Sequence, residues 1–410
     1  MTEFFTLVSP TQALQTLIDQ LNGALKSETI SSIEALNRIL AASITSPSNL
    51  PAFPRSTMDG YAVRAEDTYG ATPNIPAYLS VVDEIQMGTV PSFKLEPAQA
   101  ALIHTGGMLP ENADAVIMIE NTQTSRNDEI EIFKAVSVGE NILKIGEDVT
   151  KGSEVIASGS NLRPQDIGAL MALGITSVDV TVSPIVGLIS TGNEVVHPDS
   201  TINPGQVRDI NSYSLSALVQ SAGGIPKRYG IIKDDLTSVQ EAAKIALSEC
   251  DILVIAAGSS VSARDITSDV INNLGKPGIL LHGIAVKPGK PTILAVANNK
   301  PIFGLPGNPV SAMVVARLLL VPTINFLNGA NTRTTSSVIT AVLTRNISSI
   351  AGREDHVPVL IKTVEGKTLA EPVFGKSNLI FTLVRSTGSV IVPINSNGLV
   401  QGSLVDVHLY

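Results

Sequence analysis

The stretch Pro184-Ile185-Val186-Gly187-Leu188-Ile189-Ser190 is a continuous apolar run, and it predicts a fully buried β-strand. From this point the chain alternates strand, glycine-containing turn and helix. Such alternation predicts a doubly wound parallel α/β sheet, and sheets of this kind bind their ligands beyond the carboxyl ends of the strands. The elements expected next are a helix over Asn211–Ala222, a strand over Tyr229–Ile232, a helix over Leu236–Ser248, a strand over Asp251–Ala257 and a helix over Asp265–Leu274.

The residues before this segment predict helices and then a β-rich module. Ser9-Pro10 precedes an amphipathic pattern typical of a capped helix. Ser31 and Glu34 form a capping-box pattern, which predicts a second helix as far as about Ala42. From Pro51 onward, short β-like runs separated by glycine and proline predict a small β-rich module.

After about Leu327 the sequence returns to short β-like runs, which predict a compact all-β terminal domain. The strands expected there are Ser337–Leu343, Val357–Ile361, Leu379–Val384, Ser389–Ile394 and Leu404–Leu409.

The composition is that of a folded, loop-rich globular protein. Of the 410 residues, 44% are hydrophobic and 16% are charged, with 32 Gly and 24 Pro. That length favours roughly three domains. The net charge of −9 argues against broad nucleic-acid binding, which needs a basic surface. The histidines show no metal-ligand spacing, so zinc chemistry is not expected.

Cysteine usage and hydropathy predict a cytoplasmic protein. Cys250 is the only cysteine, so no internal disulfide can form, and its place before an apolar run predicts a small core residue. The N-terminus shows no signal-peptide pattern. The most apolar segment, Ser311 to Leu327, is interrupted by Arg317 and Pro322, so we do not expect it to span a membrane.

Two rigid turns carry the most informative chemistry. Lys287-Pro288-Gly289-Lys290-Pro291 places two ammonium groups three residues apart, and the Gly304–Ser311 segment follows and begins a helix. Proline fixes φ and glycine permits conformations closed to other residues, so such turns are shaped before a ligand arrives. Lysines anchored there lose little freedom when they bind an anion. These turns therefore predict an oxyanion or phosphate site.

Polar residues also follow the expected strands. The carboxylates Glu194, Asp234 and Asp265 are hard oxygen ligands suited to Mg²⁺. Taken singly, Thr191-Gly192-Asn193-Glu194 is most often an ordinary turn, and Asp234-Asp235 before a helix is most often an N-cap. Their joint occurrence at strand ends favours a ligand site more than any one of them does. The candidate substrate-binding residues from these strand ends are Thr191, Gly192, Arg208, Gly258 and Ser260.

The β-rich module contains two further unusual segments. Pro54–Arg64 includes Asp59-Gly60, which on its own could be a simple β-turn. Ile103-His104-Thr105-Gly106-Gly107 is a glycine turn after an expected strand. We expect His104 to pack or hydrogen-bond rather than to act as a base.

In this order, the motifs resemble those of the MoeA family of molybdopterin molybdenumtransferases, related to the E domains of gephyrin and of the plant enzyme Cnx1. The resemblance covers essentially the whole chain. Its strongest motifs are Ser56–Arg64, Thr105–Pro110, Gly146-Glu147-Asp148, Thr191–Glu194, Lys287–Pro291 and Leu305–Ser311.

The resemblance implies a four-domain homodimer. A MogA-like α/β domain would comprise residues 1–27 and 179–326, and a small linker domain 28–45 and 144–178. The β-rich module would span 46–143, and a C-terminal β-barrel 327–410. The implied reaction is Mg²⁺-dependent: molybdate and adenylylated molybdopterin bind, the metal enters the dithiolene and AMP leaves. The implied partners are a MogA-like adenylyltransferase and recipient molybdoenzymes, with no nucleic acid and no membrane.

The resemblance also implies roles for individual residues. Lys287, Lys290 and Ser311 match the family's oxyanion pocket, whose wall Pro306 and Pro309 would shape. Asp59 and Thr105 would come from the partner's β-rich module, and Gly106 beside Thr105 is a further candidate substrate-binding residue. Asp59, Asp265, Lys287 and Lys290 are the candidate catalytic residues. Glu194, Asp234 and Asp265 would handle Mg²⁺ and nucleotide, while Arg353 and Ser377 would complete the pocket from the terminal domain.

The sequence departs from the family pattern at two places. The loop Ala256–Arg264 lacks two of the usual glycines and gains an arginine, and Asn193 replaces the usual aspartate. A divergent paralogue that handles tungstate is compatible with both changes. A non-catalytic scaffold and a MogA-like adenylyltransferase are the alternative functions.

Overall fold

A computed structural model of the chain describes residues 7–23, 25–257, 261–331 and 337–410, with the side chains of 261–265 outside that description. The chain divides into two compact units. The first comprises residues 1–41, 159–163 and 177–410, and the second comprises 42–158 and 164–176. Each is described by itself.

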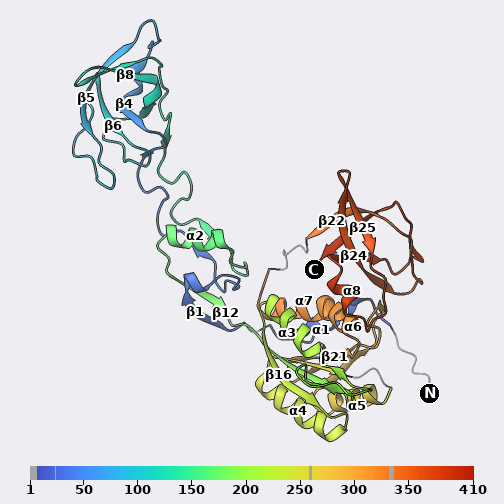
Figure 1. Ribbon diagram of the computed structural model, residues 1–410. Coiled ribbons are helices and arrows are strands. Elements are labelled where there is room, and N and C mark those ends of the chain that lie inside the picture. The colour runs from blue at the N-terminus through green and yellow to red at the C-terminus, as the bar shows by residue number, and fades with distance from the viewer. Residues whose placement is uncertain (1–6, 24, 258–260, 332–336) are drawn as a thin grey trace. The chain divides into compact units, whose positions relative to one another are not determined.

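The predicted doubly wound sheet is present in the first unit (Figure 1). Four strands are mutually parallel, as the strand–helix alternation predicts, and an antiparallel pair that the sequence analysis missed extends one edge. The strand order is β16 (Ile225–Ile232), β13 (Ile185–Thr191), β17 (Ile252–Ala257), β21 (Lys300–Pro306), β20 (Ile293–Ala297) and β18 (Pro277–His282).

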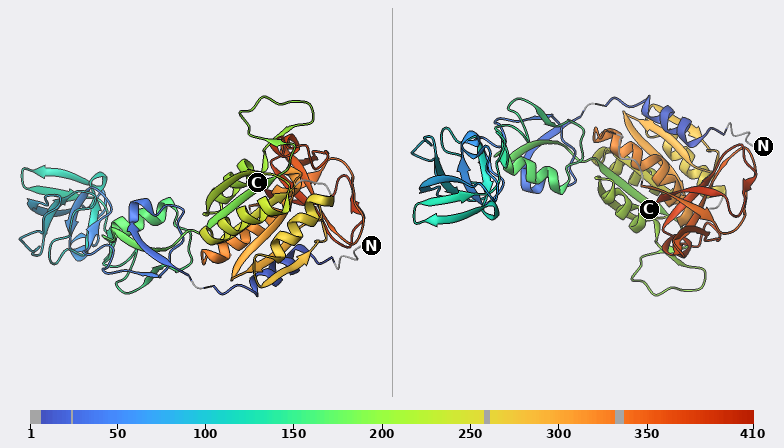
Figure 2. Two further views of the ribbon diagram at one scale, coloured as in Figure 1. Left: turned by 90° about the horizontal axis from the view of Figure 1, so that it is seen from below. Right: turned by 90° about the horizontal axis from the view of Figure 1, so that it is seen from above.

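Helices cover both faces of this sheet (Figure 2). One face is covered by α1 (Pro10–Ile18), α3 (Asn211–Ser221), α6 (Pro309–Val315) and α7 (Val321–Leu327). The other is covered by α4 (Leu236–Glu249) and α5 (Val261–Asn272). The predicted capping of α1 is confirmed, because Ser9 and Gln12 form a reciprocal capping box.

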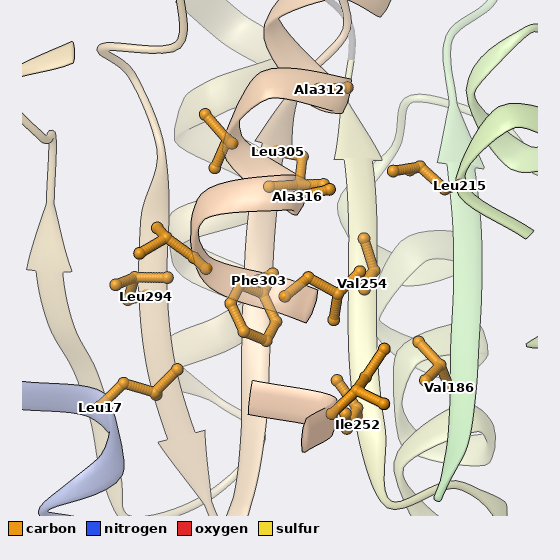
Figure 3. Packing of buried hydrophobic residues seen from close by; sticks show 14 of the residues in the cluster. Leu17, Val186, Leu215, Ile252, Val254, Leu294, Phe303, Leu305, Ala312 and Ala316 are labelled. Carbon is orange, nitrogen blue, oxygen red and sulfur yellow. The ribbon is translucent and has the colours of Figure 1, made fainter. Parts of the chain in front are cut away.

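The sheet is held by a continuous apolar core, in which Phe303 lies centrally between strands and helices (Figure 3). Phe303, Leu17 and Val254 are fully buried. Burial of each such side chain contributes about 1.5–3 kcal/mol, so the strand ends that carry polar residues stand on a rigid base. Cys250 is also buried, as predicted, and burial raises the pKa of its thiol.

The apolar run Pro309–Leu327 packs into this core. It continues from α6 through a π-helical turn, Ala316–Leu320, into α7. Among the described residues it is the one helical run of 19 residues apolar enough to cross a membrane, with mean hydropathy 1.9 and 56% of it buried inside the protein. Ala312, Leu319 and Ile324 lie in the sheet core, so the run is accounted for as a core helix.

The C-terminal domain is a closed barrel of five strands. Each strand pairs with two neighbours around the circuit, and a further short strand, β19 (Val286–Lys287), pairs with β24 from outside. The barrel order is β24 (Glu354–Val364), β25 (Lys367–Pro372), β22 (Val338–Leu343), β28 (Leu404–Leu409) and β26 (Gly388–Val392).

One predicted barrel strand is wrong. Leu379–Val384 contains the short helix α8 (Phe381–Val384) instead of a strand. The Leu379 carbonyl accepts hydrogen bonds from the Thr382 amide at 3.0 Å and hydroxyl at 2.8 Å, which closes a local turn. Phe381 and Val384 remain 63% and 68% exposed. The apolar pattern here therefore does not reflect a core strand.

The predicted helix from Ser31 to Ala42 is also wrong. Ser27–Ser31 is a strand, β1, paired with β12 (Ser177–Thr181), and only Ser32–Glu34 makes one 3₁₀ turn. The Ser31 side chain makes no capping bond. The backbone of this segment forms hydrogen bonds to distant residues instead of helical ones; for example, the Asn37 amide donates to the Leu162 carbonyl at 2.8 Å. Tertiary contacts override the local propensity.

The second unit contains the predicted β-rich module. Its six-stranded sheet packs around a core that includes Val63, Ile117 and Ile130. The order is β7 (Ala115–Met118), β4 (Gly60–Val63), β6 (Gln99–Ile103), β5 (Ala77–Glu84), β9 (Glu129–Ile132) and β8 (Thr122–Arg126). The same unit contains helix α2 (Pro164–Ala172). The four-domain boundaries given above stay a prediction.

Candidate functional site

A cavity of about 880 Å³ opens at the carboxyl ends of β17 and β21, between the central sheet and the barrel. This is the edge at which doubly wound sheets bind their ligands. Both predicted rigid turns line it, and barrel residues complete it. The predicted site residues that line it are Lys287, Lys290, Pro306, Ser311, Arg353 and Ser377. Pro309 is buried in the first turn of α6 and is not a lining residue.

The Lys287–Pro291 turn is fixed by main-chain geometry. Gly289 has a φ of +123°, and a Cβ there would lie 2.3 Å from Val315 Cγ2. The Gly289 carbonyl accepts a hydrogen bond from the buried Thr292 hydroxyl at 2.7 Å, and the Lys290 carbonyl accepts one from the Ile284 amide at 3.0 Å. The backbone is thus held on both sides, while Lys287 and Lys290 are exposed residues.

The second turn is bonded to the barrel. Asn308 occupies the N-cap position of α6, but its side chain does not cap the helix. Its Nδ2 donates instead to Ser377 Oγ at 3.0 Å, and the Val310 amide donates to the Ser377 carbonyl at 3.0 Å. Ser311, 4% exposed, therefore lies at a wall built by both domains.

The barrel also reaches the first turn. Strand β19 pairs in parallel with β24, so that Lys287 lies opposite Asp355. The Asp355 side chain is 3% exposed, with its Oδ2 3.2 Å from Lys287 Nζ and its Oδ1 2.8 Å from Arg353 Nε. Neither Asp355 nor Asn308 was predicted as a site residue, although Asn308 lies within the Gly304–Ser311 turn. The only available signal for Asp355 was its place two residues after Arg353.

The cavity is positively charged although the protein is acidic. Its charged lining residues other than histidine are the cations Lys287, Lys290, Arg353 and Lys376 and the carboxylate Asp355, a net charge of three positive units against −9 for the chain. A concave, cation-lined site concentrates anions. The arrangement suits a compact anion together with a larger organic group, for which the volume is sufficient.

The other predicted strand-end residues do not line this cavity. Thr191 is buried at the end of β13, where Gly192 also lies. Arg208 donates through Nε to the Pro198 carbonyl at 2.7 Å and through Nη2 to the Ser200 carbonyl at 3.3 Å. Its guanidinium therefore holds the loop between β14 (Val195–Val196) and β15 (Val207–Arg208), which extends away from the sheet in Figure 2.

The proposed metal ligands are not assembled in the described residues. Glu194 is exposed and Asp234 is half-buried, and no group of three His, Cys, Asp or Glu side chains within the described chain could hold a metal ion. Gly258, Ser260 and the Asp265 side chain lie outside the described residues. Asp235 caps α4 by accepting from the Ser238 amide at 2.8 Å, as expected of an Asp-Asp pair before a helix.

The β-rich unit holds a second polar cluster. Asp59 Oδ1 accepts hydrogen bonds from the Thr105 amide at 2.7 Å and the Thr105 hydroxyl at 3.2 Å, and these bonds lower the pKa of the Asp59 carboxyl. Gly106 has a φ of +88°, which the turn requires. His104 Nε2 lies 3.1 Å from Glu84 Oε1, so the expected hydrogen-bonding role of His104 is confirmed.

Three family models match consecutive parts of the chain. The MoeA N-terminal region (domain I and II) matches residues 8–174, the probable molybdopterin binding domain 187–325, and the MoeA C-terminal region (domain IV) 340–410. The chain is 35% identical over 391 residues to the molybdopterin molybdenumtransferase of Bacillus subtilis, covering 94% of this chain and 90% of that protein. It is 34% identical to the molybdopterin molybdenumtransferase of Haemophilus influenzae, with 92% and 95% covered.

Solved structures show the same relationship. A molybdopterin biosynthesis MoeA protein from Pyrococcus horikoshii matches with a TM-score of 0.86 and 32% sequence identity, covering 99% of this chain and all of that one.

Proposed function

The chain belongs to the MoeA family, and we propose that it is a molybdopterin molybdenumtransferase acting in molybdenum cofactor biosynthesis. In the proposed reaction, metal derived from molybdate enters the dithiolene of adenylylated molybdopterin and AMP is released. The observation that supports this most is the cation-lined cavity in which Lys287, Lys290 and Arg353 converge with the hydroxyls of Ser311 and Ser377.

The charges of the cavity match those of the proposed substrates. Molybdate is a dianion, and the lysine and arginine side chains are charged at neutral pH. Bonds between ionised donors and oxyanions are shorter and stronger than neutral ones. An oxyanion occupies only part of about 880 Å³, so the same cavity has room for the dithiolene end of the pterin. Holding both substrates in one site supplies proximity, which can lower a barrier by about 7–11 kcal/mol.

Magnesium is proposed as the cofactor. Glu194 and Asp234 offer the oxygen donors that Mg²⁺ prefers, and Mg²⁺ is commonly bound by one or two carboxylates with substrate phosphates and water. These two residues would hold it with Asp265, and when bound it would offset the charge of the phosphoanhydride. The chemistry of these donors fits the ion, although the described residues contain no complete set of three.

Parallel assays with molybdate and tungstate separate the proposed function from its alternatives. AMP release from adenylylated molybdopterin with either oxyanion supports the transferase, and a strong preference for tungstate identifies a tungsten-handling paralogue. ATP-dependent adenylylation of free molybdopterin would favour the adenylyltransferase. Binding of the pterin with neither activity would leave a non-catalytic scaffold. A cytoplasmic location, and transfer of the product to recipient molybdoenzymes, belong to the same proposal.

We further propose a homodimer whose sites are shared, with Asp59 and Thr105 of one subunit completing the cavity of the other. Coexpression of Asp59→Asn and Lys290→Ala chains should then restore activity at a molybdate concentration too low for the Lys290→Ala protein to use, because one of the two sites in each mixed dimer combines an intact Asp59 with an intact Lys290. With random pairing, about a quarter of wild-type AMP release is expected.

The matched control is the doubly substituted chain coexpressed with wild type. Its mixed dimers contain no intact site if the site is shared, but one intact site if each chain forms its own. Lack of complementation between the single variants, together with half-active mixed dimers in the control, would place the whole site in one chain.

A further inference from the structure

A buried carboxylate lies within the cation-lined cavity and needs an explanation. Asp355 lines the cavity with its side chain only 3% exposed, among four cationic lining side chains. A carboxylate repels an incoming anion, so an anion site would bind more tightly without it. Its presence therefore points to a contribution other than affinity.

The Asp355 carboxylate joins two cations from different domains. Its Oδ2 contacts Lys287 Nζ at 3.2 Å, from the turn of the α/β domain, and its Oδ1 contacts Arg353 Nε at 2.8 Å, from the edge of the barrel. Each oxygen is used by one cation. The contact with Arg353 uses Nε, so it leaves the two terminal nitrogens of the guanidinium outside the contact.

The two domains are already joined at this point without the carboxylate. Backbone pairing places Val286 opposite Glu354, and the Glu354 amide donates to the Ala285 carbonyl at 2.9 Å. A second backbone bond runs from the Val310 amide to the Ser377 carbonyl at 3.0 Å. The two cations are themselves partly exposed, so only the carboxylate is buried, and the cost of desolvating it offsets much of the attraction within the ion pairs. Docking of the barrel therefore does not account for Asp355.

We infer that Asp355 is a positioning residue of the oxyanion pocket, which fixes Lys287 and Arg353 at a set separation and lowers the net positive charge. Fixed cations favour an oxyanion whose oxygens match their spacing. The lower charge weakens binding of other tetrahedral dianions, such as sulfate. Asp355 thus exchanges affinity for selectivity, and this inference rests on the proposed oxyanion function of the cavity.

Three variants test the inference, with AMP release and inhibition by inorganic sulfate as measurements. Asp355→Asn removes the charge and should strengthen sulfate inhibition by about threefold to tenfold, while the maximal rate at saturating molybdate falls by at least about tenfold. Asp355→Glu keeps the negative charge but lengthens the side chain, which displaces Lys287 and Arg353. The maximal rate of AMP release should therefore fall, while sulfate inhibition stays near that of wild type. Asp406→Asn is the matched control, because Asp406 is exposed on barrel strand β28. It should resemble wild type in both measurements.

A merely structural ion pair gives a different pattern. If Asp355→Asn lowers the melting temperature but leaves the rate and sulfate inhibition of the folded protein unchanged, the inference is overturned. Should Asp355→Asn fail to fold, Asp355→Glu decides alone: wild-type rate overturns the inference, and a reduced rate with unchanged sulfate inhibition supports it.

Failure of the proposed function is recognised separately, by wild-type protein that releases no AMP. Stabilisation of the fold by sulfate then replaces the kinetic measurement, since a ligand of the native state raises the melting temperature. Greater stabilisation of Asp355→Asn than of wild type supports the inference, and equal stabilisation overturns it.

Discussion

Replacing Lys290 with alanine should raise the molybdate concentration needed for half-maximal AMP release by about 10- to 150-fold. A hydrogen bond to a charged group contributes about 1.5–3 kcal/mol, which corresponds to that range. Lys290 is exposed and lines the cavity, and among the described residues it forms no ion pair. Its carbonyl accepts from the Ile284 amide, a backbone bond that alanine retains. The turn should therefore keep its shape.

Lys244→Ala is the matched control for this change. Lys244 is exposed on α4, in the same domain but not among the cavity residues, and alanine favours the helix. The control should leave the molybdate dependence unchanged, and both variants should melt like wild type. If Lys290→Ala used molybdate as well as the control does, Lys290 would not belong to the oxyanion site.

Replacing Gly289 with alanine should destabilise the α/β domain by about 2–6 kcal/mol. Overpacking a core contact and holding a residue in a disfavoured backbone region each contribute about 1–3 kcal/mol. The backbone has φ +123° and the new Cβ would lie 2.3 Å from Val315 Cγ2, so both effects apply. Thermal unfolding should show a melting temperature lower by about 4–24 °C. Displacement of Lys287 and Lys290 should also reduce molybdate use.

Two further variants separate the causes. Gly352 has a comparable φ of +100°, but a Cβ there would meet nothing within 4 Å. Gly352→Ala therefore reports the backbone effect alone and should lower the free energy of unfolding by less than Gly289→Ala does. Val315→Ala removes the methyl group that a Cβ on residue 289 would overlap. Gly289→Ala should therefore lower the free energy of unfolding less in the Val315→Ala protein than in wild type. Equal costs in both backgrounds would show that the Val315 contact does not require glycine at this position.

The central sheet could be predicted because its signals are local. The run Pro184–Ser190 and the alternation after it encode strands that are apolar on both faces, and glycines mark the turns. The antiparallel edge could not be predicted in the same way. Strands β18 and β20 are joined by the long segment that contains the two lysines, so their pairing depends on where that connection returns. Strand β20, by contrast, pairs with β21 across the two-residue turn Asn298-Asn299, in which both residues have positive φ, and this short hairpin signal was overlooked.

The two wrong elements have different physical origins. Ser31 with Glu34 looks like a capping box, but distant segments of the chain supply partners for the backbone that follows. Leu379–Val384 has strand-like apolar content, but its side chains stay exposed around a short helix. After Ser31 long-range pairing overrides the local pattern, whereas at Leu379–Val384 hydrogen bonds within the turn favour a short helix over the predicted strand.

The site was predictable only in part. Lys287 and Lys290 stand in an unusual turn, so the sequence itself draws attention to them. Asp355 carries no such local signal, and Asn308 lies within the second predicted turn without a pattern that marks its side chain. The importance of both comes from contacts with Lys287, Arg353 and Ser377 across a domain junction. Arg208 was predicted to bind substrate, but its guanidinium donates hydrogen bonds to carbonyls of the loop between β14 and β15.

The most direct test of the central claim is to measure AMP release and protein-bound metal together, after adenylylated molybdopterin, Mg²⁺ and molybdate are mixed with the wild-type enzyme. We expect AMP to appear only when molybdate is present, with one metal entering the pterin for each AMP released. AMP release that is independent of the oxyanion, or no AMP release with molybdate or tungstate, would contradict the central claim.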